Sequence, residues 1–354
     1  MKQIKGGVTA AKGYEAASTA AGIKYQGRTD MALIYSQVPC VSAGTFTTNV
    51  VKAAPVKWDR QIVDSGAGVQ AVVVNSGIAN ACTGEEGMGY CKETAEAAAK
   101  ALNIDAAGVL VGSTGVIGMQ LPMQKLVDGI QVLAGKKAEG LQSGHDAALA
   151  IMTTDTVEKE MAVEMEIGGK TVTIGGMSKG SGMIHPNMCT MLAFITTDAA
   201  ITKEALQKAL SEDVEDTYNM ISVDGDTSTN DTAILLANGL AGNQEITYAS
   251  PEYETFKEAL HMVNETLAKK MAGDGEGATA LFEVKVVGAE SIKQAKTLAK
   301  SVVCSNLTKA AIAGHDANWG RILCAMGYSG VQFDPEKVDL FFESKAGKLQ
   351  IIEN

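Results

Sequence analysis

Residues 179–192 read Lys179-Gly180-Ser181-Gly182-Met183-Ile184-His185-Pro186-Asn187-Met188-Cys189-Thr190-Met191-Leu192, a glycine-rich polar loop that runs into an apolar segment. The apolar segment continues to Ile195 and is typical of a buried strand. Thr190 lies on the border, directly after the carbonyl of the small residue Cys189. Taken by itself, this position favours an ordinary threonine at the edge of a strand, because threonine is common in strands.

The loop before Thr190 favours a chain that cuts itself at the Cys189–Thr190 bond. Its glycines and Pro186 permit unusual backbone geometry, and strain there favours attack of the Thr190 hydroxyl on the preceding carbonyl. The peptide becomes an ester, and its cleavage gives a new N-terminal Thr190. A free α-amine has a pKa of about 7.7–8.0, so this amine is a suitable base for its own hydroxyl near neutral pH.

Composition disfavours several classes of protein. The 354-residue chain has a formal net charge of −11 and no basic run, which disfavours nucleic-acid binding. We expect no membrane helix, which needs roughly 18 uninterrupted apolar residues, and no signal peptide at the N-terminus. Six cysteines without a CxxC pair and four scattered histidines predict no disulfide framework and no metal site, and they fit a reducing cytoplasm.

Strand patterns alternate with helical patterns, which predicts an α/β protein. We expect strands at 70–75, 108–112, 162–167, 171–175, 191–195, 278–287 and 309–313. We expect helices at 92–100, from Pro122, and at 145–152, 203–221, 252–271, 291–303 and 318–327. No internal repeat or low-complexity linker is visible, so the expected boundary is the cleavage point, between residues 1–189 and 190–354.

Three further loops carry polar residues at places where chemistry is common. Ser113-Thr114-Gly115 ends a strand, and Thr114 and Gly115 fit the donors that stabilise an oxyanion in acyl transfer. The spacing alone favours an ordinary strand-to-helix turn. The loop 75–84 follows a buried strand, and in the loop 273–279 Glu276 lies among glycines. The first also fits a structural loop, and the second also fits a solvated turn.

Taken together, these motifs resemble the ornithine acetyltransferase family, also called glutamate N-acetyltransferases, of arginine biosynthesis. The match extends from the N-terminus to about residue 330. It is carried by the segments 75–77, 80–84, 113–118, 153–156, 179–188, 224–231, 273–279 and 318–322.

The resemblance implies an α/β fold like that of the self-processing β-peptidyl aminopeptidases. It implies cleavage between Cys189 and Thr190 and an assembly of two α chains (1–189) and two β chains (190–354). It implies Thr190 as nucleophile, Thr114 and Gly115 as the oxyanion pair, and substrate contacts from Thr190 and from Thr153, Lys179 and Glu276.

The resemblance also implies the reaction. Thr190 takes the acetyl group from N-acetylornithine and passes it to glutamate in a ping-pong mechanism that needs no cofactor or metal. Acetyl-CoA as a second acetyl donor stays open, because no motif decides it. Three features depart from the family pattern. Cys189 replaces the usual alanine, Ile78 interrupts an asparagine-bearing loop, and the pattern normally continues past Asn354 to an Asn and a terminal Thr or Ser that contact substrate.

Two other functions fit the same residues. An amidase or aminopeptidase needs only that water, rather than glutamate, attacks the acyl-threonine. An uncleaved or truncated relative that serves as a structural or binding subunit would keep the fold without turnover.

Overall fold

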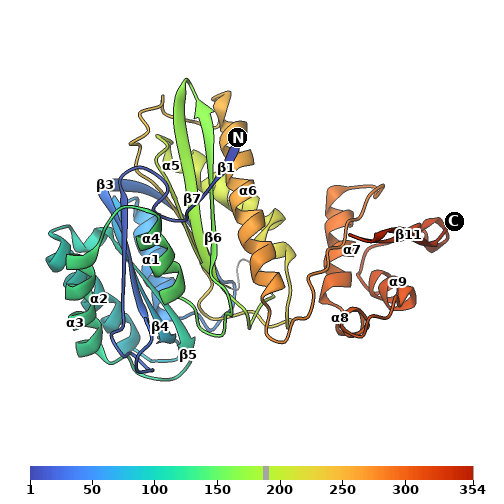
Figure 1. Cartoon of the computed structure of the whole chain (residues 1–354), viewed down its shortest axis with the longest axis horizontal. Helices are drawn as coiled ribbons and strands as arrows, with labels where there is room; N and C mark the ends of the chain where they lie inside the picture. The colour runs from blue at the N-terminus through green and yellow to red at the C-terminus, as the bar shows by residue number, and fades with distance from the viewer. Residues whose placement is uncertain (186–190, 354) are drawn as a thin grey trace.

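The computed structural model describes residues 1–185 and 191–353. Figure 1 shows a body of sheets and helices and, beside it, a smaller C-terminal lobe. The strands of the body are β1 (Lys2–Ile4), β2 (Tyr14–Thr19), β3 (Met31–Phe46), β4 (Val69–Ile78), β5 (Val109–Val116), β6 (Lys159–Ile167), β7 (Lys170–Lys179), β8 (Leu192–Thr197) and β9 (Thr232–Ala237). Its helices are α1 (Ala54–Ser65), α2 (Glu86–Leu102), α3 (Met123–Lys136), α4 (Leu141–Ala150), α5 (Lys203–Asp216) and α6 (Glu252–Gly273).

The long strand β3 joins two halves of one hydrogen-bonded sheet. The strands follow the order β1-β6-β7-β8-β9-β3-β4-β5, with β2 also paired to β3. The first part of β3 pairs with β4 and the last part with β9, with a break in register between Tyr35 and Cys40. The two halves face each other across a shared core that contains Val74 of β4, Phe194 of β8 and Ile234 of β9.

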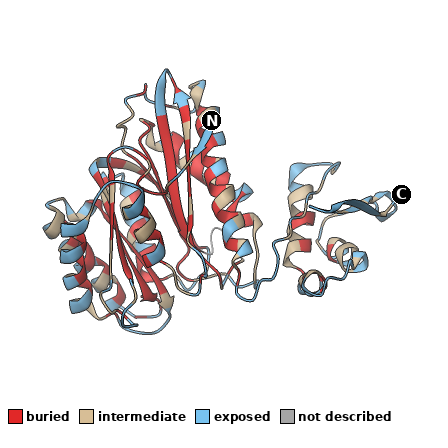
Figure 2. Cartoon of the chain, viewed as in Figure 1, coloured by how far each residue is buried: buried red, intermediate tan, exposed pale blue. Residues whose placement is uncertain are grey.

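Alternating side chains explain the layers. Successive residues of a strand point to opposite faces, so Val74 enters the shared core while its neighbour Val73 packs toward α2 and α3. On the other half, Phe194 enters the shared core while Ile195 packs toward α5 and α6. The body is therefore a helix–sheet–sheet–helix sandwich, and the sheets are its most buried part (Figure 2).

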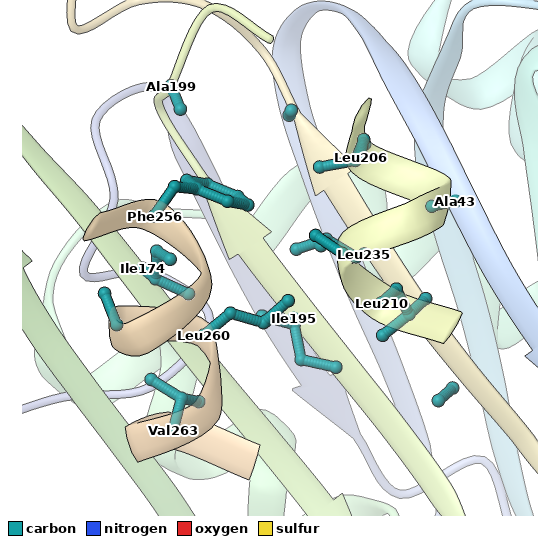
Figure 3. Close-up of a cluster of buried hydrophobic side chains, with 14 of the residues drawn as sticks. Ala43, Ile174, Ile195, Ala199, Leu206, Leu210, Leu235, Phe256, Leu260 and Val263 are labelled. Carbon is teal, nitrogen blue, oxygen red and sulfur yellow. The ribbon is translucent and has the colours of Figure 1, made fainter. Parts of the chain in front are cut away.

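The helices α5 and α6 cover the outer face of the β6–β9 half. Figure 3 shows Leu206 and Leu210 of α5 and Phe256 and Leu260 of α6 gathered around Ile195, and all five side chains are fully buried. Burying one such side chain stabilises the fold by about 1.5–3 kcal/mol. This cluster fixes the position of β8, whose first residue, Leu192, follows the predicted reactive stretch.

The C-terminal lobe is built from α7 (Ile292–Cys304), α8 (Asn306–Ala313), α9 (Trp319–Gly327) and the hairpin β10 (Leu340–Ser344)–β11 (Gly347–Ile352). Figure 2 shows that most of its surface is exposed or half-buried. Polar contacts attach it to the body: Lys309 Nζ donates to the carbonyl of Val223 at 2.7 Å, and Cys304 Sγ lies 3.5 Å from His185 Nδ1.

The predicted α/β class is confirmed, and two predicted strands are wrong. Residues 309–313 belong to the helix α8, which Ser305 caps by accepting a hydrogen bond from the Thr308 N–H. Residues 278–287 keep their alternating pattern but pair with no strand among the described residues, so no ladder forms. The predicted helix 203–221 ends at Asp216 and is followed by a short 3₁₀ turn, Tyr218–Met220. Within the described residues, no helix is long and apolar enough to cross a membrane.

Candidate active site

A cavity of about 340 Å³ opens where β7 ends and β8 begins. Five residues predicted from the sequence line this one cavity, although they come from four separate segments: Thr114, Gly115, Thr153, Lys179 and Glu276. Met191 and Leu192 also line it, so the chain enters β8 at the cavity wall. The predicted nucleophile Thr190 and its predecessor Cys189 lie outside the described residues.

Thr114 and Gly115 lie at the end of β5, beside the end of the parallel strand β4. Gly115 has φ +129, and a Cβ there would lie 2.3 Å from the carbonyl carbon of Gly77. Only glycine fits this position, because both the backbone angle and the close approach exclude a side chain. Thr114 is 8% exposed and lines the cavity from the end of β5.

Buried amides hold this strand end in place. Asn230 Nδ2 donates to the carbonyl of Ser113 at 2.7 Å and to that of Ala79 at 2.6 Å. The Ser113 hydroxyl donates to Asn75 Oδ1 at 2.7 Å. Because Asn230 lies just before β9, these bonds connect the two halves of the sheet at the cavity and fix Thr114 relative to β8.

Lys179 is the last residue of β7 and pairs with Leu192 of β8. Its side chain is 8% exposed, and burial lowers the pKa of its ammonium group. The charge of Lys159 acts in the same direction, whereas Asp155 and Glu276 raise the pKa of Lys179. A cation at the cavity wall suits a substrate carboxylate, which Lys binds as a point charge.

Thr153 and Glu276 approach the cavity on two loops. The Thr153 N–H donates to Asp155 Oδ2 at 3.0 Å, and Arg28 donates to the Thr153 carbonyl at 3.2 Å. The Glu276 N–H donates to the Ser181 carbonyl at 2.9 Å. The Glu276 carboxylate lies over Gly182, where a Cβ would come within 2.5 Å of Oε1.

Sequence reasoning missed Asp231, which also lines the cavity. It directly precedes β9, and Thr232 pairs with Leu192, so Asp231 lies beside the start of β8. It is 1% exposed, and neither carboxyl oxygen forms a hydrogen bond among the described residues. Burial raises the pKa of Asp231 well above its usual range, against smaller opposing effects of the polar groups of Ser228 and Met191. The signals in the sequence are its place at the end of the motif 224–231 and directly before a buried strand.

Comparison with known proteins identifies the family. The model of the ArgJ family matches residues 15–354. The chain belongs to the ArgJ family. The "arginine biosynthesis bifunctional protein ArgJ" of Thermotoga neapolitana is 53% identical over 92% of this chain and 82% of its own length. The ArgJ protein of Symbiobacterium thermophilum is 54% identical over 99% of this chain and 86% of its own length.

Solved structures agree with the ArgJ assignment. An ArgJ chain from Bacillus halodurans is 43% identical with a TM-score of 0.51, and the match covers 52% of this chain and 96% of that chain. The PH0078 protein of Pyrococcus horikoshii is 13% identical with a TM-score of 0.51, over 77% of this chain and 88% of that chain, and shares the fold alone. The family resemblance read from the motifs is therefore confirmed. The individual roles of the cavity residues stay predictions.

Proposed function

We propose that this chain is an acyltransferase of arginine biosynthesis that moves the acetyl group of N2-acetylornithine to glutamate through an acetyl ester on Thr190. The observation that carries the proposal is the single cavity that gathers Thr114, Gly115, Thr153, Lys179 and Glu276 beside the start of β8. Membership of the ArgJ family supports it, because the relatives above are named as bifunctional proteins of arginine biosynthesis.

Self-cleavage before Thr190 is part of the proposal. It divides the chain into residues 1–189 and 190–354, and the strands support this division. The strand β8 pairs with β7 on one side and β9 on the other, over six residue pairs each. In a chain cut before β8, these two ladders would still hold β8, from Leu192 onward, at the cavity wall.

The proposed reaction has two halves. The Thr190 hydroxyl attacks the acetyl carbonyl of N2-acetylornithine. The N–H groups of Thr114 and Gly115, together with the Thr114 hydroxyl, stabilise the oxyanion. The intermediate collapses to the acetyl-threonine ester, and ornithine leaves as its amine takes up a proton. The amine of glutamate then attacks the ester, loses a proton, and leaves as N-acetylglutamate while the Thr190 hydroxyl re-forms.

The charges of the cavity suit these substrates. Lys179 brings a cation and Glu276 an anion to one cavity, and an amino-acid substrate carries both a carboxylate and an ammonium group. Charge-assisted hydrogen bonds to both ends would orient the acetyl group toward Thr190. Thr153, held by Asp155 and Arg28, completes the proposed substrate contacts.

We extend the proposal to the second acetyl donor, the assembly and the compartment. Acetyl-CoA as an alternative donor would account for a second activity of a bifunctional enzyme, and no bound cofactor enters the transfer itself. The two cleaved chains share one sheet, and the family resemblance supports an α2β2 assembly. The described cysteines, Cys40, Cys82, Cys91, Cys304 and Cys324, are all free, which supports a reducing cytoplasm.

An acetyl-transfer assay tests the proposal. The full-length protein should convert N2-acetylornithine and glutamate to ornithine and N-acetylglutamate, and Thr190→Ala should abolish this conversion. Ornithine release that does not depend on glutamate would favour the amidase alternative. Transfer by the Thr190→Ala variant at the wild-type rate would contradict the proposed nucleophile.

A further inference from the structure

Lys159, the first residue of β6, is a lysine with no exposed side-chain surface. Fully buried lysines are rare unless they are paired. The ammonium of Lys159 lies 2.8 Å from Asp155 Oδ1 and 2.6 Å from Asp274 Oδ2, and it also donates to the Val157 carbonyl at 3.1 Å. One cation therefore neutralises two carboxylates whose side chains are 0% and 6% exposed.

Asp155 connects Lys159 to two of the cavity residues. Its Oδ1 accepts from the Gly180 N–H at 2.7 Å as well as from Lys159, and its Oδ2 accepts from the Thr153 N–H at 3.0 Å. Gly180 directly follows Lys179 in the chain. Asp155 thus fixes the backbone beside both Thr153 and Lys179, and both of its oxygens are occupied.

Asp274 connects Lys159 to the loop that carries Glu276. Its carboxylate accepts from the backbone N–H of Thr156 at 3.0 Å and from the Thr156 hydroxyl, and its carbonyl accepts from the Ser181 hydroxyl at 2.7 Å. Two residues later, Glu276 reaches the cavity. Among ion pairs of the described residues, Lys159–Asp274 is the one that joins residues on opposite sides of position 190.

Lys179 lies among the same charged groups, but its ammonium has no ion-pair partner among the described residues. The charged and titratable groups that act on it are Asp155, Lys159, Asp231 and Glu276. Within residues 1–185 and 191–353, its ammonium forms no ion pair or hydrogen bond, because Lys159 rather than Lys179 occupies Asp155. A cation without an internal partner at the wall of a cavity is the arrangement that an anionic ligand requires.

We propose that Lys159 is a positioning residue that neutralises Asp155 and Asp274. It thereby holds together the segments that carry Thr153, Lys179 and Glu276, and it keeps Lys179 available for the substrate carboxylate. The inference rests on the proposed function only for the identity of the substrate. If the chain is cut before Thr190, the same ion pair connects the two resulting chains.

Steady-state kinetics test the positioning role. In Lys159→Met, Asp155 loses its cation and attracts Lys179, so KM for N2-acetylornithine should rise about tenfold or more, as expected for a lost charge-assisted hydrogen bond. The value of kcat should change less, because the groups around the acetyl carbonyl are untouched. The double variant Lys159→Met/Asp155→Asn removes the competing acid, so KM should return toward the wild-type value.

The matched control is Lys137→Met, which removes a lysine paired with Glu15 at 2.6 Å but away from the cavity residues. Its KM should stay at the wild-type value. If Lys159→Met lowers only kcat, or if the double variant is no better than the single one, the positioning role is contradicted.

A second measurement does not depend on activity. The pH dependence of Lys179 acetylation by acetic anhydride, followed by peptide mass spectrometry, reports the pKa of its amine. Lys159→Met should move the labelling midpoint to higher pH, because a neighbouring cation is lost and Asp155 is released. Lys159→Gln, which still donates a hydrogen bond to a carboxylate, gives the same test if the methionine variant does not fold.

The two measurements separate the two proposals. A shifted labelling midpoint in a protein without acetyl transfer would contradict the proposed function and leave the role of Lys159 standing. An unchanged midpoint, or one at lower pH, in a folded variant would overturn the role of Lys159 whatever the activity.

Discussion

The body and the C-terminal lobe are organised in opposite ways. In the body, two sheet halves are buried on both faces, and three apolar clusters run through the layers. In the lobe, buried apolar side chains are few and small, with Leu298 and Val302 the largest, and the hairpin β10–β11 is mostly exposed (Figure 2). The rigid body carries the cavity, and the lobe attaches to it through a small set of polar contacts.

The difference between the body and the lobe matters because the positions of the oxyanion donors must be precise. Acyl transfer requires donors held within fractions of an ångström of the reacting carbonyl. Strand ends that are buried on both faces and joined by Asn230 can supply that precision. We therefore expect substitutions in the body to change activity or stability strongly, and comparable substitutions in the lobe to leave the cavity intact.

The largest expected effect is that of Gly115→Ala. The added methyl group would meet the Gly77 carbonyl, and φ +129 would be strained, so the oxyanion donors move and kcat should fall about 100-fold or more. The matched control is Gly330→Ala in the lobe, where φ is +87 but nothing lies within 4 Å of the added Cβ. Equal losses of kcat in the two variants would contradict the expectation that the cavity depends on the body and not on the lobe.

A core substitution should give the next largest effect. Leu260→Ala removes a fully buried side chain from the cluster in Figure 3 and should lower the free energy of unfolding of the body by about 2–5 kcal/mol. Leu298→Ala, in the lobe, should leave that transition unchanged. Denaturant unfolding followed by a probe in the body measures both, and a single transition lowered equally by each variant would show that the regions unfold as one.

The pH dependence of stability should expose Asp231. Its pKa is raised by burial, so the unfolded chain loses this proton near pH 4 while the folded chain keeps it. The contribution of Asp231 to stability is therefore fully present below about pH 3.9 and is lost as the pH rises toward the folded pKa. Asp231→Asn removes this decline and should stabilise the protein at pH 7 by about 1–3 kcal/mol. Glu343→Gln, exposed in the lobe, is the control, and equal pH slopes in wild type and Asp231→Asn would refute the assignment.

The smallest expected effect belongs to the surface of the lobe. Lys337 and Asp334 are 3.2 Å apart, with side chains 78% and 49% exposed. Such pairs contribute little, so Lys337→Ala should change the free energy of unfolding by less than about 0.5 kcal/mol. A larger loss would mean that the lobe depends on surface ion pairs more than its packing suggests.

Much of the body could be predicted from the sequence, because its signals are local. Continuous apolar runs mark β4 and β8, and glycine beside Thr114 marks the end of β5. The lobe was harder to predict. Residues 309–313 look like a strand, but a strand needs a neighbour to pair with, and the Ser305 cap starts a helix there instead.

The site could be predicted only where residues stand in recognisable motifs. Lys159 and Asp231 gain their roles from partners that are distant in the chain. Asp274, for example, is 115 residues from Lys159. No periodicity or local motif reports such proximity, so the roles of these two residues become visible only when the sheet halves and loops are placed.

Intact-mass analysis of the purified protein, with and without N2-acetylornithine, tests both the proposed self-cleavage and the proposed acetyl ester on Thr190. We predict two chains with the masses of residues 1–189 and 190–354. One acetyl group should be added to the second chain when N2-acetylornithine is present and glutamate is absent. The acetyl group should disappear when glutamate is added. A single uncut chain, or an acetyl group carried on residues 1–189, would contradict this prediction.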